Sequence, residues 1–600
     1  MKKIIYITLI VLGFISIASC SDFLNEEPVN KISGEVYFNS EKALKIYATG
    51  FVEKLMPSVA SLTRGDQFSD ICVTTQTEAF LKVNDYTAQS ATNWRTSHWT
   101  QLHNINYYLT NMHEAAPYVQ NDEIMKHYEG IGRFWRAWFY WEKVKTFGDV
   151  PWYDKPIDRD DEEQLYKSRD KREFVMEKIL EDLDFASTYC STDDKFVNAN
   201  VINRYVAMAL KARICLYEGT YRKYHGLSDS ESWLRESLEA TEYMMENSPY
   251  SLISNPGEEM TNYSKVFKSI APQYQEVIFA NEMSDELNRF HDASWYYASG
   301  TAGQRNSATK AFVNMFLNLN GTRFTDQPNY NKVEFKDEFR NRDYRLRQTI
   351  ITPYYEKIVS GTRTNDFSKV FPGLGSQLTY YRIIKWNTDN DANESNTSSA
   401  NSLSVFRYAE ILLAYAEAKA ELGEMNTTEW NRSIRLLRER SGVDGRTPDV
   451  ADPYLMAYYP GVTDKWILEV RRERTIEMYV ENVRRDDLVR WKMGPKLTVE
   501  FAGLYIPKVG KAFDMDGDGK NDIYFYSTSI PRPTTLEPGV TYVQITANEG
   551  DAATGFGINS DNCLVYKLER EWQDYKYLYP IPKEAYDINQ NLLPQNPGWE

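Results

Sequence analysis

The sequence predicts a mainly α-helical fold in which consecutive helices form pairs, with long loops and short β-strands on one side. Apolar residues recur every three or four positions through most of the first half and again after residue 404, as in amphipathic helices. Several of these stretches end at glycine or proline and are followed by short connectors. Residues 249–401 and 498–579 instead mix turn-forming residues with short β-branched runs, which indicates loops and strands laid over a helical frame.

The individual elements follow from these patterns. Helices are expected at 41–60, 99–116, 122–147, 172–190, 203–221, 404–422, 429–440 and 464–481, and short strands at 277–279 and 380–384. The stretch 122–147 carries a heavy stripe of aromatic and aliphatic residues, which we interpret as core, and Gly148 and Pro151 end it. Helix pairs of this kind resemble tetratricopeptide repeats, although the sequence shows no clear self-similarity at a period of about 34 residues.

The first residues have the pattern of a secretory leader. Two lysines precede an apolar stretch from Ile4 to Ile17, which is too short to span a bilayer comfortably. The sequence Ile-Ala-Ser-Cys20 resembles a bacterial lipobox, in which cleavage precedes the cysteine and the cysteine then receives acyl chains. We therefore predict lipidation of Cys20 and stable anchoring to a membrane, since two or more chains suffice for this. A leader that is cut without lipidation is the alternative.

Composition narrows the class of ligand. The formal net charge is −16, and an acidic surface argues against nucleic acid and anionic lipid headgroups, because both bind through lysine and arginine. The chain has 43 tyrosines and 14 tryptophans, whose rings can stack on sugars but also make good core material. Cys72, Cys190, Cys215 and Cys563 form no CxxC pair, so zinc is not expected, and buried free thiols are favoured over a disulfide. Composition thus leaves carbohydrate binding as a hypothesis.

Seven segments in order resemble the SusD/RagB family, the surface lipoproteins that partner TonB-dependent transporters in glycan uptake. They are Asp22-Phe-Leu24 with Pro28; Trp99 to Asn106 with Gly130 to Trp138 and Phe147 to Pro151; Ala209 to Tyr217; Arg342 to Leu346; Phe406 to Glu421; Arg472 to Trp491; and Tyr577 to Pro582 with Gln595 to Trp599. Charged residues in these segments are spaced by three or four, so we interpret them as structural ion pairs within or between helices. Asp487, Arg490 and Trp491 are expected to form a buried or semi-buried junction.

The resemblance implies a tetratricopeptide-like scaffold and a non-enzymatic, glycan-binding lipoprotein on the outer face of the outer membrane. Such a protein captures oligosaccharides and delivers them to a SusC-like TonB-dependent transporter. The expected organisation is a lipoprotein signal peptide at 1–19, a lipid-anchored tether at 20–40, an N-terminal helical part at 41–250 and a C-terminal part with loop-rich insertions at 251–600, in one compact body. Two alternatives stay open. One is a surface glycoside hydrolase, whose two carboxylates need only lie close in space; the other is a subunit that gates the transporter or carries peptides.

The ligand-binding candidates lie on two loops that combine aromatic rings with planar polar groups. In sugar-binding members of the family that the chain resembles, contacts come from loops in these general regions. One loop offers Asn93, Trp94 and Arg95, and the other offers Trp295 and Tyr296 near His291 and Asp292. A polar cluster upstream, Arg64 with Asp66 and Asp70, is a weaker candidate. Each aromatic could instead close a loop over the core.

The segment Asp514-Met-Asp516-Gly-Asp518-Gly519-Lys-Asn-Asp522 is the best metal candidate. Its carboxylates occupy the first, third, fifth and ninth positions of a calcium loop, with glycine at the sixth. The twelfth position is Phe525 and not the bidentate glutamate, so the segment is not a complete EF-hand. No cofactor is required by this interpretation, and bound Ca²⁺ is an additional possibility; the alternative is an aspartate-rich turn.

Overall fold

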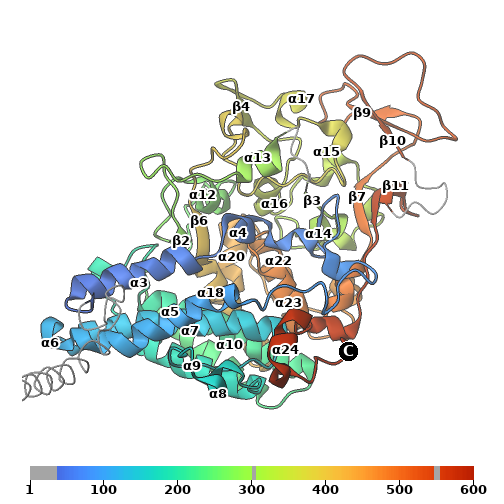
Figure 1. The fold of residues 1–600 in the computed structure, drawn as a ribbon. Coiled ribbons are helices and arrows are strands. Elements are labelled where there is room, and N and C mark those ends of the chain that lie inside the picture. Colours follow the sequence, from blue (N-terminus) through green and yellow to red (C-terminus); the bar gives the residue numbers. More distant parts are fainter. Residues whose placement is uncertain (1–36, 300–305, 546–553) are drawn as a thin grey trace, which may run out of the picture.

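The computed structural model describes residues 37–299, 306–545 and 554–600. The predicted signal peptide, Cys20 and most of the predicted tether lie outside the described residues. The longer helices are α3 (Glu41–Leu55), α5 (Thr100–Asn111), α7 (Asp122–Phe147), α9 (Arg172–Tyr189), α10 (Arg204–His225), α11 (Ser230–Asn247), α18 (Tyr408–Glu421) and α22 (Lys465–Glu477). They pack in sequence, α5 on α7, α7 on α9, α10 on α11, α11 on α18 and α18 on α22. Figure 1 shows this helical layer below a second layer of loops and strands.

The longest helix, α7, has clear sequence causes for both of its ends. The side chain of Asn121 accepts hydrogen bonds from the backbone N–H groups of Glu123 and Ile124, at 3.0 and 3.1 Å, which satisfies two free donors of the first turn. Gly148 follows the last turn at a φ of +74°, a conformation that favours glycine. Between these ends the aromatic stripe is buried, with Trp135 and Tyr140 fully enclosed. This confirms the interpretation of the stripe as core.

Shorter helices connect and cover the frame. They are α4 (Val59–Arg64), α6 (Ala116–Val119), α8 (Glu162–Leu165), α12 (Asn262–Lys268), α13 (Ala293–Ala298), α14 (Lys310–Met315), α15 (Phe335–Glu338), α16 (Tyr344–Thr349), α17 (Phe367–Val370), α19 (Thr427–Asn431), α20 (Ile434–Arg440), α21 (Pro453–Tyr458), α23 (Arg484–Arg490) and α24 (Lys583–Ile588). No helix among the described residues is both long and apolar enough to cross a membrane.

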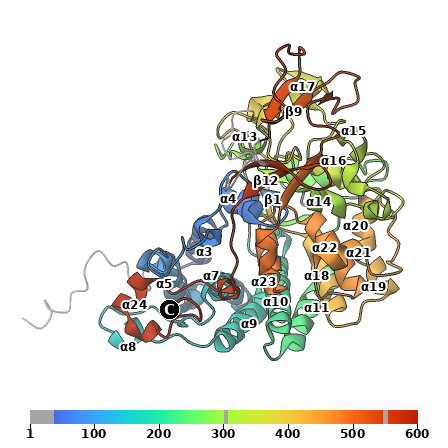
Figure 2. The same ribbon diagram turned by 90° about the vertical axis from the view of Figure 1, so that its right-hand side faces the viewer.

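The strands among the described residues are short and form five small sheets. They are β1 (Cys72–Val73), β2 (Val277–Asn281), β3 (Ser307–Ala308), β4 (Lys357–Val359), β5 (Thr362–Thr364), β6 (Leu403–Arg407), β7 (Phe501–Tyr505), β8 (Ala512–Phe513), β9 (Ile523–Tyr526), β10 (Thr541–Gln544), β11 (Thr554–Ile558) and β12 (Cys563–Leu568). Antiparallel pairs are β1 with β3, β2 with β6, and β4 with β5. The two other sheets have three strands each, in the orders β11-β12-β7 and β10-β9-β8. Most of these strands lie in the loop-rich layer (Figure 2).

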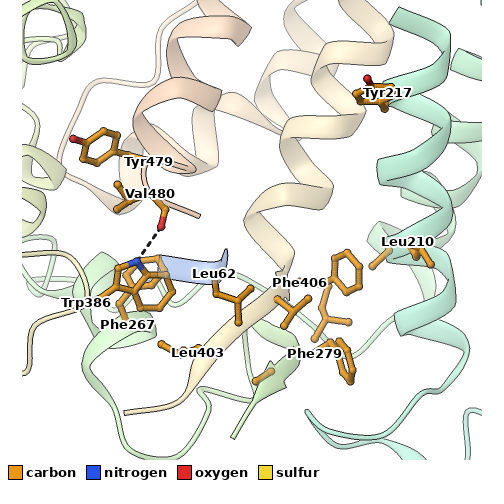
Figure 3. Packing of buried hydrophobic residues seen from close by; sticks show 14 of the residues in the cluster. Leu62, Leu210, Tyr217, Phe267, Phe279, Trp386, Leu403, Phe406, Tyr479 and Val480 are labelled. Atoms are coloured by element: carbon orange, nitrogen blue, oxygen red, sulfur yellow. Dashed lines mark hydrogen bonds between the residues drawn. The ribbon is translucent and has the colours of Figure 1, made fainter. Parts of the chain in front are cut away.

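The sheet formed by β2 and β6 joins the two layers. Phe279 and Phe406 stack within it, with ring centroids 6.2 Å apart, and Trp138 of α7 reaches Phe406 at 5.5 Å. On the loop side, the indole Nε1 of Trp386 donates a hydrogen bond to the carbonyl oxygen of Val480 at 2.9 Å (Figure 3). One continuous apolar core therefore crosses from the helices to the loops.

Five of the expected elements differ in the structure, including the helices expected at 99–116 and 429–440, which are divided into α5 and α6 and into α19 and α20. The helix expected at 404–422 is wrong in its first turn, because Leu403–Arg407 pairs with β2 as β6 and helix α18 begins at Tyr408. The stretch 41–60 divides into α3 and α4 around Pro57, which lacks the N–H that a helix needs. Residues 380–384 make isolated bridges at Arg382 and Ile383 and no strand.

Buried ion pairs join the helices, as the charge spacing indicated. Glu477 receives hydrogen bonds from Arg440 at 2.6 Å, Arg407 at 2.6 Å and Arg345 at 3.0 Å, and all four side chains are buried. The expected junction is also confirmed, since Asp487 and Arg490 are 2 % exposed. The four described cysteines are free and buried. The buried ion pairs around Glu477 and Asp487 therefore connect the helices in the interior of the frame.

Candidate ligand-binding site

The structure places the two predicted aromatic groups in different parts of the molecule. Trp94 and its neighbours lie beside α5 and α24 at the helical end, whereas Trp295 and Tyr296 lie on α13 in the loop-rich layer. Figures 1 and 2 both show α13 far from α5 and α24. The two groups therefore cannot contact one small ligand together.

A cavity of about 660 Å³ opens beside Trp94. Its walls come from three segments that are distant in sequence: the start of α5, the loop after α7, and the C-terminal stretch around α24. Its lining residues include Trp94, Arg95, Trp99, Asn106, Tyr153 and Glu584. A volume of this size lies within the usual range for small-molecule sites, roughly 300–1,000 Å³. We call it the α5–α24 pocket.

Three aromatic rings, those of Trp94, Trp99 and Tyr153, line the pocket beside a larger number of aliphatic residues. The ring of Trp94 lies edge-on to Phe147 at 4.7 Å and 5.2 Å from the ring of Trp99. Trp99 in turn lies 6.2 Å from Tyr153, with the two rings nearly perpendicular. Trp94 is 8 % exposed, so packing fixes its position, whereas Trp99 and Tyr153 are half-buried. The pocket thus presents rigid ring surfaces of the kind that suits the apolar faces of sugars.

Two buried polar atoms in this wall have no hydrogen-bond partner among the described residues. Asn106 is buried, and its Nδ2 donates to the carbonyl oxygens of Tyr153 at 2.9 Å and Lys155 at 3.3 Å. Its Oδ1 has no donor, and the indole Nε1 of Trp99 has no acceptor. Because an unsatisfied buried polar atom is costly, such atoms in a pocket wall indicate a polar ligand. Asn106 and Trp99 thus bring one unpaired acceptor and one unpaired donor to this wall.

Charged groups lie at the rim of the same pocket and beside its rings. Arg95 Nε donates to Glu584 at 3.1 Å, and both side chains are more than half exposed, so this pair lies at the rim. Lys143 packs 4.9 Å from the ring of Trp99, and burial lowers the pKa of its amine to about 8. Burial and then the charges of Lys143 and Arg95 lower the pKa of His98. Asn93 lies on the same loop, and its Oδ1 is buried without a partner.

The predicted residues on and near α13 mainly contact other side chains of the protein. The guanidinium of Arg64 lies 3.7 Å from the centroid of the Tyr296 ring and forms an ion pair with Asp292. The hydroxyl of Tyr296 donates to Gln67 at 2.8 Å, and burial raises the pKa of Tyr296 to about 12. Trp295 is half-buried. These contacts join α4 to α13 and leave little of the Tyr296 ring face available.

Asp66 lies in the interior. It is 1 % exposed, and its Oδ1 accepts a hydrogen bond from the backbone N–H of Arg484 at 3.0 Å. Burial raises the pKa of this carboxyl to about 7. Asp66 is not among the residues that line the α5–α24 pocket. Asp70 is equally buried and bonds to Arg484 through both oxygens.

Three of the four aspartates expected to bind calcium come together. Asp514, Asp516 and Asp522 place carboxylate oxygens within 4.8 Å of one another, in the turn between β8 and β9. Asp518 lies outside this group and pairs with Lys520 at 2.8 Å. Carboxylate oxygens at such spacing are the ligands that Ca²⁺ prefers, so the residues present fit this ion.

Sequence reasoning missed part of the pocket wall. It singled out Trp94 and Arg95 but did not propose Trp99, Asn106, Tyr153 or Glu584 as ligand contacts. The segment 151–157 and the stretch 582–592 carry no motif that links them to α5. Trp99 and Asn106 lie within a segment that resembles the SusD/RagB family. That resemblance is the one sequence signal that points to these two residues.

Comparison with known proteins gives a consistent result. Residues 275–599 match the model of the SusD family, and residues 48–435 match a family described as starch-binding and associating with the outer membrane. The SusD-like protein P25 of Formosa agariphila is 23 % identical over 527 residues, covering 81 % of this chain and 89 % of that protein. The SusD-like protein P2 of the same organism is 23 % identical over 610 residues and covers 99 % of both chains.

Solved structures show the same fold. A SusD-like protein of Bacteroides fragilis matches with a TM-score of 0.65 at 19 % identity, covering 96 % of this chain and all of that one. A SusD-like carbohydrate-binding protein of the same species matches with a TM-score of 0.65 at 19 % identity, covering 93 % of this chain and all of that one. These likenesses confirm the mainly α-helical scaffold that the sequence predicts.

Proposed function

The chain belongs to the SusD family, and we propose that it is a cell-surface lipoprotein that captures oligosaccharides and delivers them to a TonB-dependent transporter of the outer membrane. The observation that supports capture is the α5–α24 pocket, where rings and two unsatisfied polar atoms line one cavity. The description of the second matched family, starch-binding and associating with the outer membrane, points to the same class of ligand and the same membrane.

Capture in this pocket would combine stacking with hydrogen bonding. The half-buried ring of Trp99 would cover the C–H face of one sugar unit, with Tyr153 nearly perpendicular to it. Asn106 Oδ1 would accept a hydrogen bond from a sugar hydroxyl, and Trp99 Nε1 would donate one. Arg95 and Glu584 would contact hydroxyls at the rim. A hydroxyl can both donate and accept, so it satisfies both kinds of unpaired atom.

Delivery would depend on the predicted anchor. Acyl chains on Cys20 would hold the protein at the outer leaflet, and the tether at 20–40 would keep it beside a SusC-like transporter. Holding a ligand next to the transporter raises its effective concentration, so a modest affinity suffices. The proposed partners are thus an oligosaccharide, the transporter and the membrane, and no nucleic acid is expected because the chain is acidic.

We also propose that Asp514, Asp516 and Asp522 bind Ca²⁺. The ion would neutralise three carboxylates that lie close together and would rigidify the turn between β8 and β9. Backbone N–H groups of Gly517 and Gly519 already orient the two oxygens of Asp514, at 2.6 and 3.1 Å. The ion has a structural role in this proposal.

The experiment that tests the proposed function is a glycan array probed with the soluble chain from Ser21 to Glu600. We expect retention of one class of oligosaccharide and no release of reducing ends from that glycan on long incubation. Absence of retention across the array would contradict glycan capture and would favour a gating or peptide-carrying role. Steady release of reducing ends would identify the chain as a glycoside hydrolase.

A further inference from the structure

A second and larger cavity, of about 1,110 Å³, lies apart from the α5–α24 pocket along the helices. Its walls come from α3, the first turns of α7, the segment 195–202 before α10, and the end of β2. None of its lining residues belongs to the proposed glycan site. We call it the α3–α7 cavity.

A buried histidine in the wall has an unused donor. His127 is 1 % exposed, and its Nδ1 accepts a hydrogen bond from the backbone N–H of Ser191 at 3.1 Å. The neutral ring therefore carries its proton on Nε2, which has no partner among the described residues. Burial, with a smaller effect of Lys195 and an opposing one of Asp193, lowers the pKa of His127 to about 4. At neutral pH the ring is an uncharged donor that lacks an acceptor.

Cationic side chains outnumber carboxylates around the cavity. Lys45, Lys195 and Arg289 line it, and none of them pairs with a carboxylate among the side chains that the structure describes. Arg289 donates instead to the amide oxygen of Asn281 at 2.7 Å. The two lining carboxylates have contacts of their own, since Glu282 accepts from Asn200 at 2.8 Å and Glu53 lies 3.5 Å from Lys54. The chain as a whole is acidic, so this local excess of cationic side chains over carboxylates favours an anionic oxygen as the ligand atom.

The rest of the wall is mostly aliphatic. Ile46, Val52, Met56, Ile131 and Ile202 line it. Phe196 and Tyr128 supply the aromatic rings, and Phe196 packs against His127 with ring centroids 4.2 Å apart. Aliphatic surface gives no stacking face for a sugar but does bury the apolar body of a ligand.

We propose that the α3–α7 cavity is a second binding site, which takes a small ligand that carries a carboxylate on an apolar body. The carboxylate accepts from His127 Nε2 and is attracted by Lys195 and Arg289, while the apolar body packs against the aliphatic wall. This site is independent of glycan capture, so either proposal can fail alone.

The test uses the soluble chain from Ser21 to Glu600 and isothermal titration with 3-phenylpropionate, its uncharged amide 3-phenylpropionamide, and galacturonate. We expect 3-phenylpropionate to bind at least about tenfold more tightly than the amide, because a charge-assisted hydrogen bond is lost with the charge. Galacturonate, a carboxylate on a polar body, should bind more weakly than 3-phenylpropionate. Equal binding of acid and amide, tighter binding of galacturonate, or no binding of 3-phenylpropionate at about 10 mM would overturn the proposal.

Variants of the cavity wall test whether 3-phenylpropionate binds in the α3–α7 cavity. His127→Phe removes the donor and should abolish binding, but it changes a buried residue and requires a check of the fold by circular dichroism. The rim variants Lys195→Gln and Arg289→Gln change exposed residues and should each weaken 3-phenylpropionate about threefold or more. Lys332→Gln, an exposed lysine elsewhere, is the matched control and should leave binding unchanged. Unchanged binding in both rim variants would contradict the assignment, whatever His127→Phe does.

Discussion

Asn106 of α5 donates a hydrogen bond from Nδ2 to the carbonyl oxygen of Tyr153 at 2.9 Å, and this bond joins the helix to the loop after α7. Both donors of the amide are directed to that loop, since the second bond reaches Lys155. The amide oxygen is therefore left for another partner. One buried side chain thus holds two walls of the α5–α24 pocket together and contributes the acceptor that we assign to a sugar hydroxyl.

Replacement of Asn106 should affect both stability and binding. In Asn106→Leu the carbonyl oxygens of Tyr153 and Lys155 lose their donors, and we expect a loss of about 1–3 kcal/mol in the free energy of unfolding, measured with urea. Glycan retention should fall as well at a temperature where the variant is folded. Asn111→Leu is the matched control, because Asn111 bonds to Tyr107 within its own helix. Equal effects of the two substitutions would argue against a special role for Asn106.

Glu477 should be a main determinant of stability at neutral pH. Burial opposes its charge, but the guanidinium groups of Arg440, Arg407 and Arg345 outweigh burial and hold its pKa well below the usual range. Glu477→Gln should therefore lower the free energy of unfolding by about 3–5 kcal/mol at pH 7, because buried guanidinium groups lose their partner. Glu439→Gln, which breaks an exposed pair with Arg435, should change it by less than about 1 kcal/mol.

The same carboxylate predicts a direction for the pH dependence. Because its pKa is lower in the folded state, the stabilisation is present above the unfolded value near 4.5 and is lost as the pH falls below it. The difference between wild type and Glu477→Gln should thus narrow below about pH 4.5. A difference that stayed constant from pH 7 to pH 3 would show that Glu477 is not the titrating group.

The carboxylate of Asp66 should lower the free energy of unfolding at high pH, whereas that of Glu477 raises it. Its folded-state pKa of about 7 lies above the ordinary value of 3.8, so ionisation disfavours the folded state as the pH rises through this interval. Asp66→Asn keeps an oxygen for the N–H of Arg484 and removes the charge. We expect it to raise the free energy of unfolding by about 2–4 kcal/mol at pH 8 and to have almost no effect near pH 4. Destabilisation at pH 8 would contradict this account.

Much of the frame could be predicted from the sequence because its causes are local. Helix α7 begins and ends as expected, since Asn121 and Gly148 cap it whatever surrounds them. The start of α18 could not be predicted, because pairing with β2 overrides the apolar spacing at Leu403–Arg407. The pocket could be predicted only in part. Trp94 and Arg95 were found by residue type, but the wall at Glu584 comes from a segment almost 500 residues away and depends on the tertiary fold.

Calcium should stabilise the chain through three aspartates and not through the fourth. Addition of CaCl₂ should raise the melting temperature, and excess chelator should reverse the increase, because a ligand bound by the folded state alone stabilises it. Asp516→Asn should abolish this response. Asp518→Asn, which changes the neighbour outside the three-carboxylate group, should preserve it. A response that is lost equally in both variants would contradict the assigned ligand set.

The anchor should matter for uptake and not for capture. Cys20→Ala removes the predicted site of acylation, so the protein should still retain glycan in solution but fail to support growth of the host on the cognate glycan. Growth on a simple sugar is the control. Normal growth of the Cys20→Ala strain on the cognate glycan would refute a role for the lipid in delivery.

The central claim is that the chain captures glycan in the α5–α24 pocket, and affinity electrophoresis of two tryptophan variants tests it most directly. Both Trp99 and Trp295 are half-buried, but Trp99 directly precedes α5 and Trp295 lies on α13, and these two helices are far apart (Figures 1 and 2). In a gel that contains the glycan identified on the array, we predict that Trp99→Ala loses retardation while Trp295→Ala migrates like wild type, with both variants folded by circular dichroism. Loss of retardation in Trp295→Ala with full retardation in Trp99→Ala would contradict the claim and would place capture at α13.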